Sequence, residues 1–171
     1  MTLQAIDRAI TRFGRIVGHL LDAFIGVLLA GLLAVVFSQF VDRNYVTFWT
    51  DSPEEYVKIG LTWLCFVGLA RAFATGEAIH ISFLHDIVPA WMSLAIDTLI
   101  DGLILVVLFI LVAKSVVMVE MADYQIILGT DFSLAVPATG VLVGFVLLVP
   151  LIAWRLIRRL AVAAGRLEGA P

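Results

Sequence analysis

The stretch DSPEEYVKIGLTWLCFVGLARAFAT, residues 51–75, holds the start, the body and the end of one helix. Ser52 is a favourable N-cap and Pro53 suits the first helical position. Glu55 stands three residues after the cap, so its carboxylate is expected to reach back to Ser52 in a capping box. The pattern predicts a helix over about 53–75.

Charged residues lie inside this predicted helix near both of its ends. Lys58 and Arg71 bracket 12 uncharged residues, which is fewer than the roughly 20 that a membrane span needs. A span here must therefore include the charges themselves. Glu54 stands four residues before Lys58, an arrangement that favours an ion pair on one helix face, and we expect it to neutralise Lys58 near the membrane interface.

The composition of the whole chain indicates a membrane protein. Hydrophobic residues make up 62% of the 171 residues and charged residues 15%, and the mean hydropathy is +1.07. At about 20 residues per span this leaves room for roughly four spans and for no separate soluble domain. Cys65 is the only cysteine, which excludes an intrachain disulfide and a multi-thiolate metal site.

We therefore predict an all-α, polytopic membrane protein with one four-helix domain, a bundle, over residues 1–171. An amphipathic segment with apolar residues at spacings of three and four is expected ahead of the first span. Pro150 should kink the last span. The predicted amphipathic helix covers about 2–20, and the predicted spans cover about 21–41, 53–75, 89–113 and 134–154.

The positions of the arginines predict the orientation of the spans. Arginines precede the first span and follow the fourth, which by the positive-inside rule places both termini in the cytoplasm. The arginines concerned are Arg8, Arg12, Arg15, Arg155, Arg158, Arg159 and Arg166.

Two acids fall inside the third predicted span. Asp97 and Asp101 stand four residues apart and so share a helix face, where two carboxylates repel each other unless one is protonated or both find cations. Arg71 and a base from another subunit are the candidate partners, and Asp22 is a further acid at similar depth. Structural pairing and a proton relay both remain open.

No enzyme signature is visible in the chain. His80 and His85 fall in one loop and His19 near a membrane surface, which does not suit a bis-histidine haem or a metal site. A nucleophile elbow, a P-loop and a zinc-protease helix are not found, and neither are the repeated, interrupted segments of a self-contained transporter. Gly140 and Gly144 permit close helix packing.

The stretch from Ser52 to Ile81 resembles a known family. The residues that carry the resemblance are Ser52-Pro53-Glu54-Glu55, Trp63, Phe66, Gly68, Ala70-Arg71, Gly76 and His80-Ile81. They look like the small membrane subunit, DctQ-like, of tripartite ATP-independent periplasmic (TRAP) transporters. Length, span count and cytoplasmic termini agree with this resemblance.

The resemblance implies a non-catalytic subunit in the bacterial inner membrane. In such systems a periplasmic binding protein delivers an organic acid to a large membrane subunit. An ion gradient, usually of sodium, drives the transport. The small subunit extends the scaffold of the large one and has no cofactor, metal or substrate site of its own. Expected partners are these two proteins and membrane lipids, with no nucleic acid. The candidates for subunit contact or anchoring are Glu54, Glu55, Lys58, Trp63, Arg71 and His80 by position, and Asp97 and Asp101 from their charge.

Two other functions compete with this one. The chain could be an autonomous proton-coupled transporter that uses Asp97 or Asp101 as the carrier group. It could also anchor a redox enzyme to the membrane, in which case it would bind haem.

Overall fold

The computed structural model describes residues 2–45, 47, 49, 52–75 and 90–163. Four helices lie in these ranges, α1 (Thr2–Asn44), α2 (Pro53–Thr75), α4 (Ala90–Ala122) and α5 (Ala135–Ala163). Each contains a segment that is long and apolar enough to cross a membrane. The predicted all-α class with four candidate spans is confirmed.

The helices differ in extent from the predicted segments at three places. The amphipathic segment and the first span form one continuous helix, α1, rather than two elements. Helix α4 continues to Ala122, beyond the expected end near 113. Helix α5 continues to Ala163, beyond the expected end near 154, and includes Pro150, whose missing N–H removes one backbone hydrogen bond of the helix.

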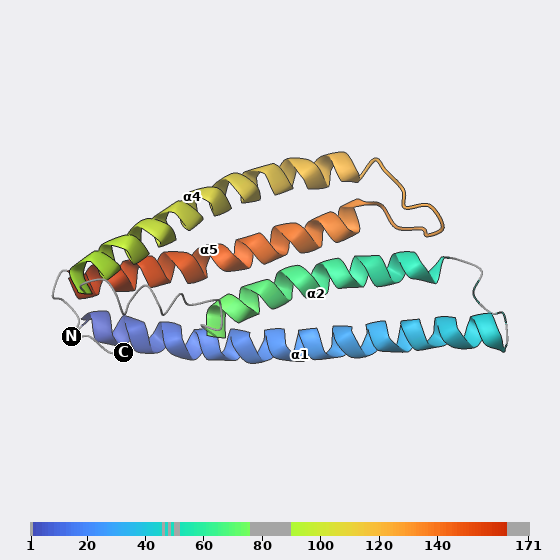
Figure 1. Ribbon diagram of the computed structural model, residues 1–171, viewed down its shortest axis with the longest axis horizontal. Coiled ribbons are helices and arrows are strands. Elements are labelled where there is room, and N and C mark those ends of the chain that lie inside the picture. Colours follow the sequence, from blue (N-terminus) through green and yellow to red (C-terminus); the bar gives the residue numbers. More distant parts are fainter. Residues whose placement is uncertain (1, 46, 48, 50–51, 76–89, 164–171) are drawn as a thin grey trace.

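The helices form an open row and not a closed bundle. Helix α1 packs against α2, α2 against α5, and α5 against α4, so the order across the row is α1, α2, α5, α4 (Figure 1). Among the described residues, the backbones of the other helix pairs do not come into close contact. The predicted bundle is wrong in this respect, because apolar helix faces can be covered by lipid as well as by another helix.

Glycines allow α2 and α5 to approach each other closely. A Cβ atom added at Gly144 of α5 would lie 2.6 Å from Cβ of Phe66 and 2.9 Å from its carbonyl oxygen. A Cβ atom added at Gly140 would lie 3.0 Å from the ring of Trp63. The predicted close packing at these two glycines is confirmed, and the partner is α2, which runs parallel to α5 (Figure 1).

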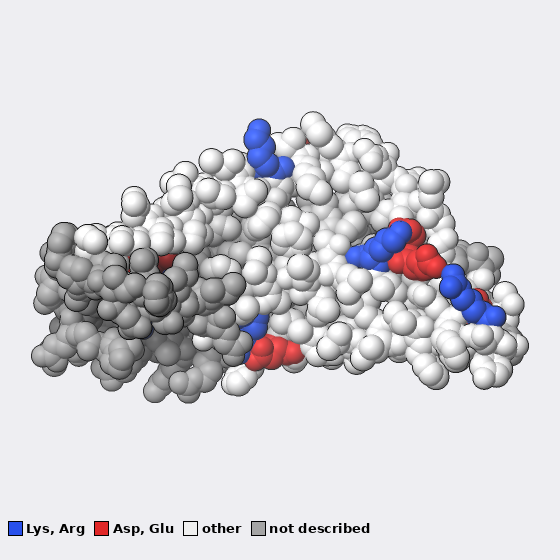
Figure 2. Space-filling model, in the orientation of Figure 1, with Lys and Arg blue, Asp and Glu red and all other residues white. Residues whose placement is uncertain are grey.

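Little of the chain is buried within the row. A small core of Ala70, Leu108, Leu148 and Ile152 forms where α2, α4 and α5 meet. Large apolar side chains elsewhere are exposed, for example Val27 at 75%. Figure 2 shows that most of the visible described surface is uncharged and that its charged side chains stand in a few separate groups. Such a surface suits a bilayer, where lipid replaces the missing core.

Candidate functional site

Most of the ion pairs lie toward one or the other end of the helices. We call one the Ser52 end, where α1 ends, α2 begins and residues 123–134 join α4 to α5. The other is the Arg71 end, where α1 and α4 begin and α2 and α5 end.

At the Ser52 end, the start of α2 is tied to the connection between α4 and α5. The backbone N–H of Ser52 donates to the carbonyl of Gly129 at 3.1 Å, and the N–H of Glu55 donates to the carbonyl of Ser52 at 3.0 Å. Gly129 has φ +82°, a left-handed conformation that glycine adopts without strain. The predicted capping box is therefore wrong in its side-chain half, because Gly129 and not Glu55 satisfies the Ser52 N–H.

The ion pairs of the Ser52 end also differ from the prediction. Lys58 Nζ donates to Glu55 Oε1 at 2.6 Å, while Glu54 Oε1 accepts from Arg43 Nη2 at 3.1 Å. The predicted pair between Glu54 and Lys58 is wrong, because Glu54 pairs with Arg43 at the end of α1 and Lys58 pairs with Glu55. The Arg43 and Glu54 side chains are 77% and 61% exposed, so the pair adds little stability.

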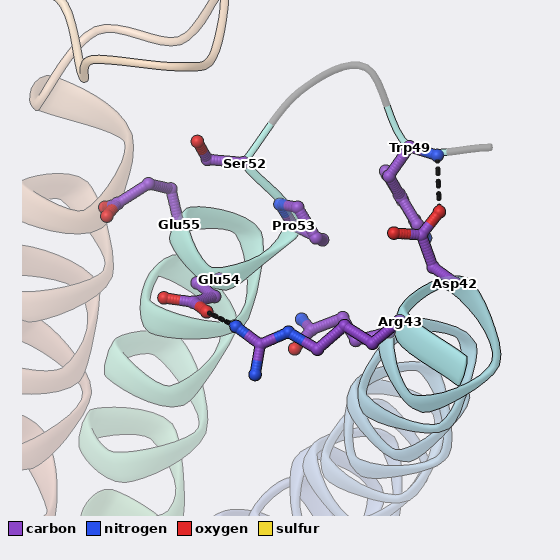
Figure 3. Close-up of a pocket in the computed structure, with 8 residues that line it drawn as sticks. Asp42, Arg43, Trp49, Ser52, Pro53, Glu54 and Glu55 are labelled. Carbon is purple, nitrogen blue, oxygen red and sulfur yellow. Dashed lines mark hydrogen bonds and ion pairs between the residues drawn. The ribbon is translucent and has the colours of Figure 1, made fainter. Parts of the chain in front are cut away.

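A polar pocket opens between the end of α1 and the start of α2. The backbone N–H of Trp49 donates to Asp42 Oδ1 at 2.9 Å, and the Arg43 to Glu54 pair crosses the opening (Figure 3). The pocket holds about 330 Å³. Its contacts join α1 to α2 within the chain.

Trp63 lies in the middle of α2 and contacts the two neighbouring helices, α1 and α5. Its Nε1 donates to the carbonyl of Val136 at the start of α5, at 3.0 Å. Its ring meets the ring of Phe24 on α1 edge to face, with centroids 6.3 Å apart. The structure thus places this predicted contact residue inside the row, where it links α1, α2 and α5.

At the Arg71 end, the partner of Arg71 is Asp22 of α1. Arg71 Nε lies 2.5 Å from Asp22 Oδ1, and Nη2 lies 2.8 Å from Oδ2, a two-pronged geometry typical of strong arginine to carboxylate pairs. Gly18 makes room for this guanidinium, since a Cβ atom there would lie 3.1 Å from Nη1. The prediction that Arg71 pairs with the acids of the third span is wrong.

The acids of α4 are paired with two arginines of α5. Asp101 is 1% exposed and accepts hydrogen bonds from Arg155 through both oxygens. Arg159 Nη1 lies 2.9 Å from Asp101 Oδ2, and Arg159 Nη2 lies 3.5 Å from Asp97 Oδ2. We call Asp97, Asp101, Arg155 and Arg159 the α4–α5 charge cluster.

The cluster balances two negative charges against two positive ones. Burying a carboxylate without a partner is costly, and two guanidinium groups around Asp101 remove most of that cost. From the sequence, these arginines were predicted only to orient the spans, and their pairing with the α4 acids was not foreseen. Their spacing carried a usable signal, since Arg155 and Arg159 stand four residues apart, as do Asp97 and Asp101, so each pair shares a helix face.

The described residues contain no group of three or more His, Cys, Asp or Glu side chains that could hold a metal ion. His80, a predicted contact residue, lies outside the part of the chain that the structure describes, as do Gly76 and Ile81.

Comparison with known proteins identifies the family. No curated protein sequence matches the chain closely enough to count as a relative. The sequence profile described as "Tripartite ATP-independent periplasmic transporters, DctQ component" matches residues 32–162. This match covers α2, α4, nearly all of α5 and the end of α1, and so includes both the Ser52 end and the α4–α5 charge cluster. The chain belongs to the DctQ family and is the small, non-catalytic membrane component of a TRAP transporter.

Proposed function

We propose that this chain is a static scaffold subunit that joins the large membrane subunit of its transporter. In this proposal a periplasmic binding protein delivers an organic acid to the large subunit, and a sodium gradient drives uptake across the bacterial inner membrane. The observation that carries the proposal is the pairing of Asp22, Asp97 and Asp101 with arginines of the same chain. Acids held in this way stabilise helix contacts and leave no free carrier group among them.

The open row supports the same proposal. A single layer of helices encloses no water-filled path between its members, and its wide apolar faces are available to a partner or to lipid. The autonomous proton-coupled alternative gains no support from Asp101, because a carrier carboxylate has to exchange protons with water, whereas Asp101 is buried between two guanidinium groups. Asp97, the other candidate carrier, is paired with Arg159.

The proposed orientation has the Arg71 end in the cytoplasm, together with both termini. Its support is the positive charge at that end, where Arg158 is exposed next to the paired Arg155 and Arg159. A Cys65→Ser chain with Tyr124→Cys tests it in intact cells. A membrane-impermeant thiol reagent should label Cys at 124 without lysis, and labelling only after lysis would reverse the orientation.

Copurification from the native host tests the scaffold role. An affinity-tagged chain, extracted in a mild detergent, should bring down a much larger hydrophobic subunit in a fixed ratio. Loss of the gene for this chain should also abolish uptake of the organic acid in cells that still make the large subunit. A chain that purifies alone from cells with normal uptake would refute the scaffold role.

A further inference from the structure

Two largely apolar pockets of about 330 and 310 Å³ lie along α5 between α2 and α4. Pro137, Ala138 and Val141 form the floor of the pocket nearer the Ser52 end. Phe145, Leu148 and Ile152 form the floor of the second pocket, which begins about one helix turn further along α5. We call the two pockets together the α5 trough.

The α5 trough is small compared with a helix. Its floor residues Ala138, Leu148 and Ile152 are only 2 to 4% exposed, because α2 and α4 stand close on either side. On the opposite side of α5, Val143 and Val146 are 37% and 49% exposed. A helix with its side chains is about 10 Å wide, which is more than two pockets of about 330 and 310 Å³ can hold. A single hydrocarbon chain is much thinner and can lie between the side chains that line them.

Charged groups line the α5 trough only where it approaches the Ser52 end. Glu55 and Lys58 belong to the lining of the first pocket, and their side chains are 26% and 67% exposed. Glu55 points away from the Arg43 to Glu54 pair (Figure 3). The lining of the first pocket therefore includes one cation and one anion, bonded to each other at 2.6 Å, beside apolar side chains. This is the charge complement of a zwitterionic lipid headgroup.

We propose that the α5 trough binds one acyl chain of a phospholipid whose headgroup carries a primary ammonium group. The acyl chain lies over the floor of α5, the phosphate accepts hydrogen bonds from Lys58 Nζ, and the ammonium donates to the Glu55 carboxylate. A primary ammonium is required because a quaternary ammonium has no N–H to donate. The present bond between Lys58 and Glu55 is partly exposed, so little stability is lost when each group turns to the lipid.

Native mass spectrometry of the full chain in detergent tests the headgroup site. The probes are phosphatidylethanolamine, phosphatidylcholine and phosphatidylglycerol with identical acyl chains, each titrated after delipidation. Phosphatidylethanolamine should bind best. Lys58→Gln should weaken its binding roughly tenfold, and Glu55→Gln should reduce it to the level of phosphatidylcholine. Lys114→Gln, which removes a charge from α4, is the matched control and should bind normally. Equal binding of the three lipids, or equal losses in the Lys58 and Lys114 variants, would overturn the proposal.

A second pair of variants tests the trough itself. Ala138→Phe fills the floor and should abolish the bound lipid, while Val143→Phe adds the same bulk on the opposite side of α5 and should not. Lipid binding that survives Ala138→Phe would place the lipid elsewhere. Should the Ala138 variant fail to fold, the Lys58 and Glu55 variants still decide the question.

A partner helix in the trough is the competing outcome. The assembled transporter would then carry no lipid on this chain, and Lys58→Gln would weaken the association of the subunits instead.

Discussion

Asp101 of α4 and Arg155 of α5 are paired across the helix contact, although 54 residues separate them in the chain. Arg159 reaches the same carboxylate from one helix turn further along α5. The two helices are thus joined by charge as well as by apolar packing, at a depth where an unpaired carboxylate would be costly. This pairing explains why acids in a membrane helix do not imply a transport site here.

Removing the charge of Asp101 should destabilise the chain. In Asp101→Asn the guanidinium groups of Arg155 and Arg159 lose their shared carboxylate while partly buried, which costs about 3 kcal/mol. Thermal unfolding in detergent, followed by circular dichroism, measures the effect. Asp97→Asn is the internal control and should cost much less, because Asp97 lies at 3.5 Å from Arg159 and is more exposed than Asp101. Equal losses in both variants would contradict the assigned geometry.

The pair between Asp22 and Arg71 should matter less for stability than the α4–α5 charge cluster. The Asp22 side chain is 47% exposed, against 1% for Asp101, and Asp101 is bound by two arginines. Asp22→Asn is therefore expected to lower Tm by less than Asp101→Asn in the same assay. A larger fall for Asp22→Asn would show that the contact between α1 and α2 depends on this pair.

The contact between α2 and α5 should depend on the absence of a side chain at Gly144. Gly144→Ala places a Cβ atom against Phe66 and its backbone, so the helices have to separate, at a cost of about 1 to 3 kcal/mol. Gly102→Ala is the matched control, because nothing lies within 4 Å of a Cβ atom there. Gly144→Ala should unfold at a lower temperature than Gly102→Ala. Equal stability of the two variants would mean that α2 and α5 are not in close contact at Gly144.

The connection between α4 and α5 should be sensitive at Gly129. Alanine at φ +82° is strained by about 1 to 2 kcal/mol, and its Cβ atom would also lie 2.4 Å from Ser52 Oγ. Hydrogen exchange at the first turn of α2 should rise in Gly129→Ala, since Ser52 N–H loses its acceptor. Gly26→Ala, in open space on α1, should leave this exchange unchanged. Unchanged exchange in both variants would show that the loop does not hold the start of α2.

The sequence predicted the elements better than their arrangement. Helix α2 could be placed because Pro53 and the charges near its ends mark its limits. The row order could not, because a face of α4 or α5 that meets lipid is as apolar as one that meets another helix. Hydrophobic periodicity therefore carries little information about neighbours in a membrane protein.

The charged contacts show the same limit. Arg71 and Asp22 were both recognised, but their depths in the membrane did not reveal that α1 rather than α4 lies beside α2. The partners of Asp97 and Asp101 could have been found from the matching four-residue spacing of Arg155 and Arg159. The neighbouring residues of Ser52 also led to a wrong prediction. Its N–H donates to the carbonyl of Gly129, which lies 77 positions away in the chain, and not to Glu55.

Reconstitution into proteoliposomes tests most directly whether this chain is a required subunit that does not transport by itself. Uptake of the host's organic acid under an inward sodium gradient is measured with the binding protein present, for vesicles with this chain alone, the large subunit alone, or both. Uptake is expected only when both are present. Sodium-driven uptake by this chain alone, or full uptake by the large subunit without it, would contradict the account.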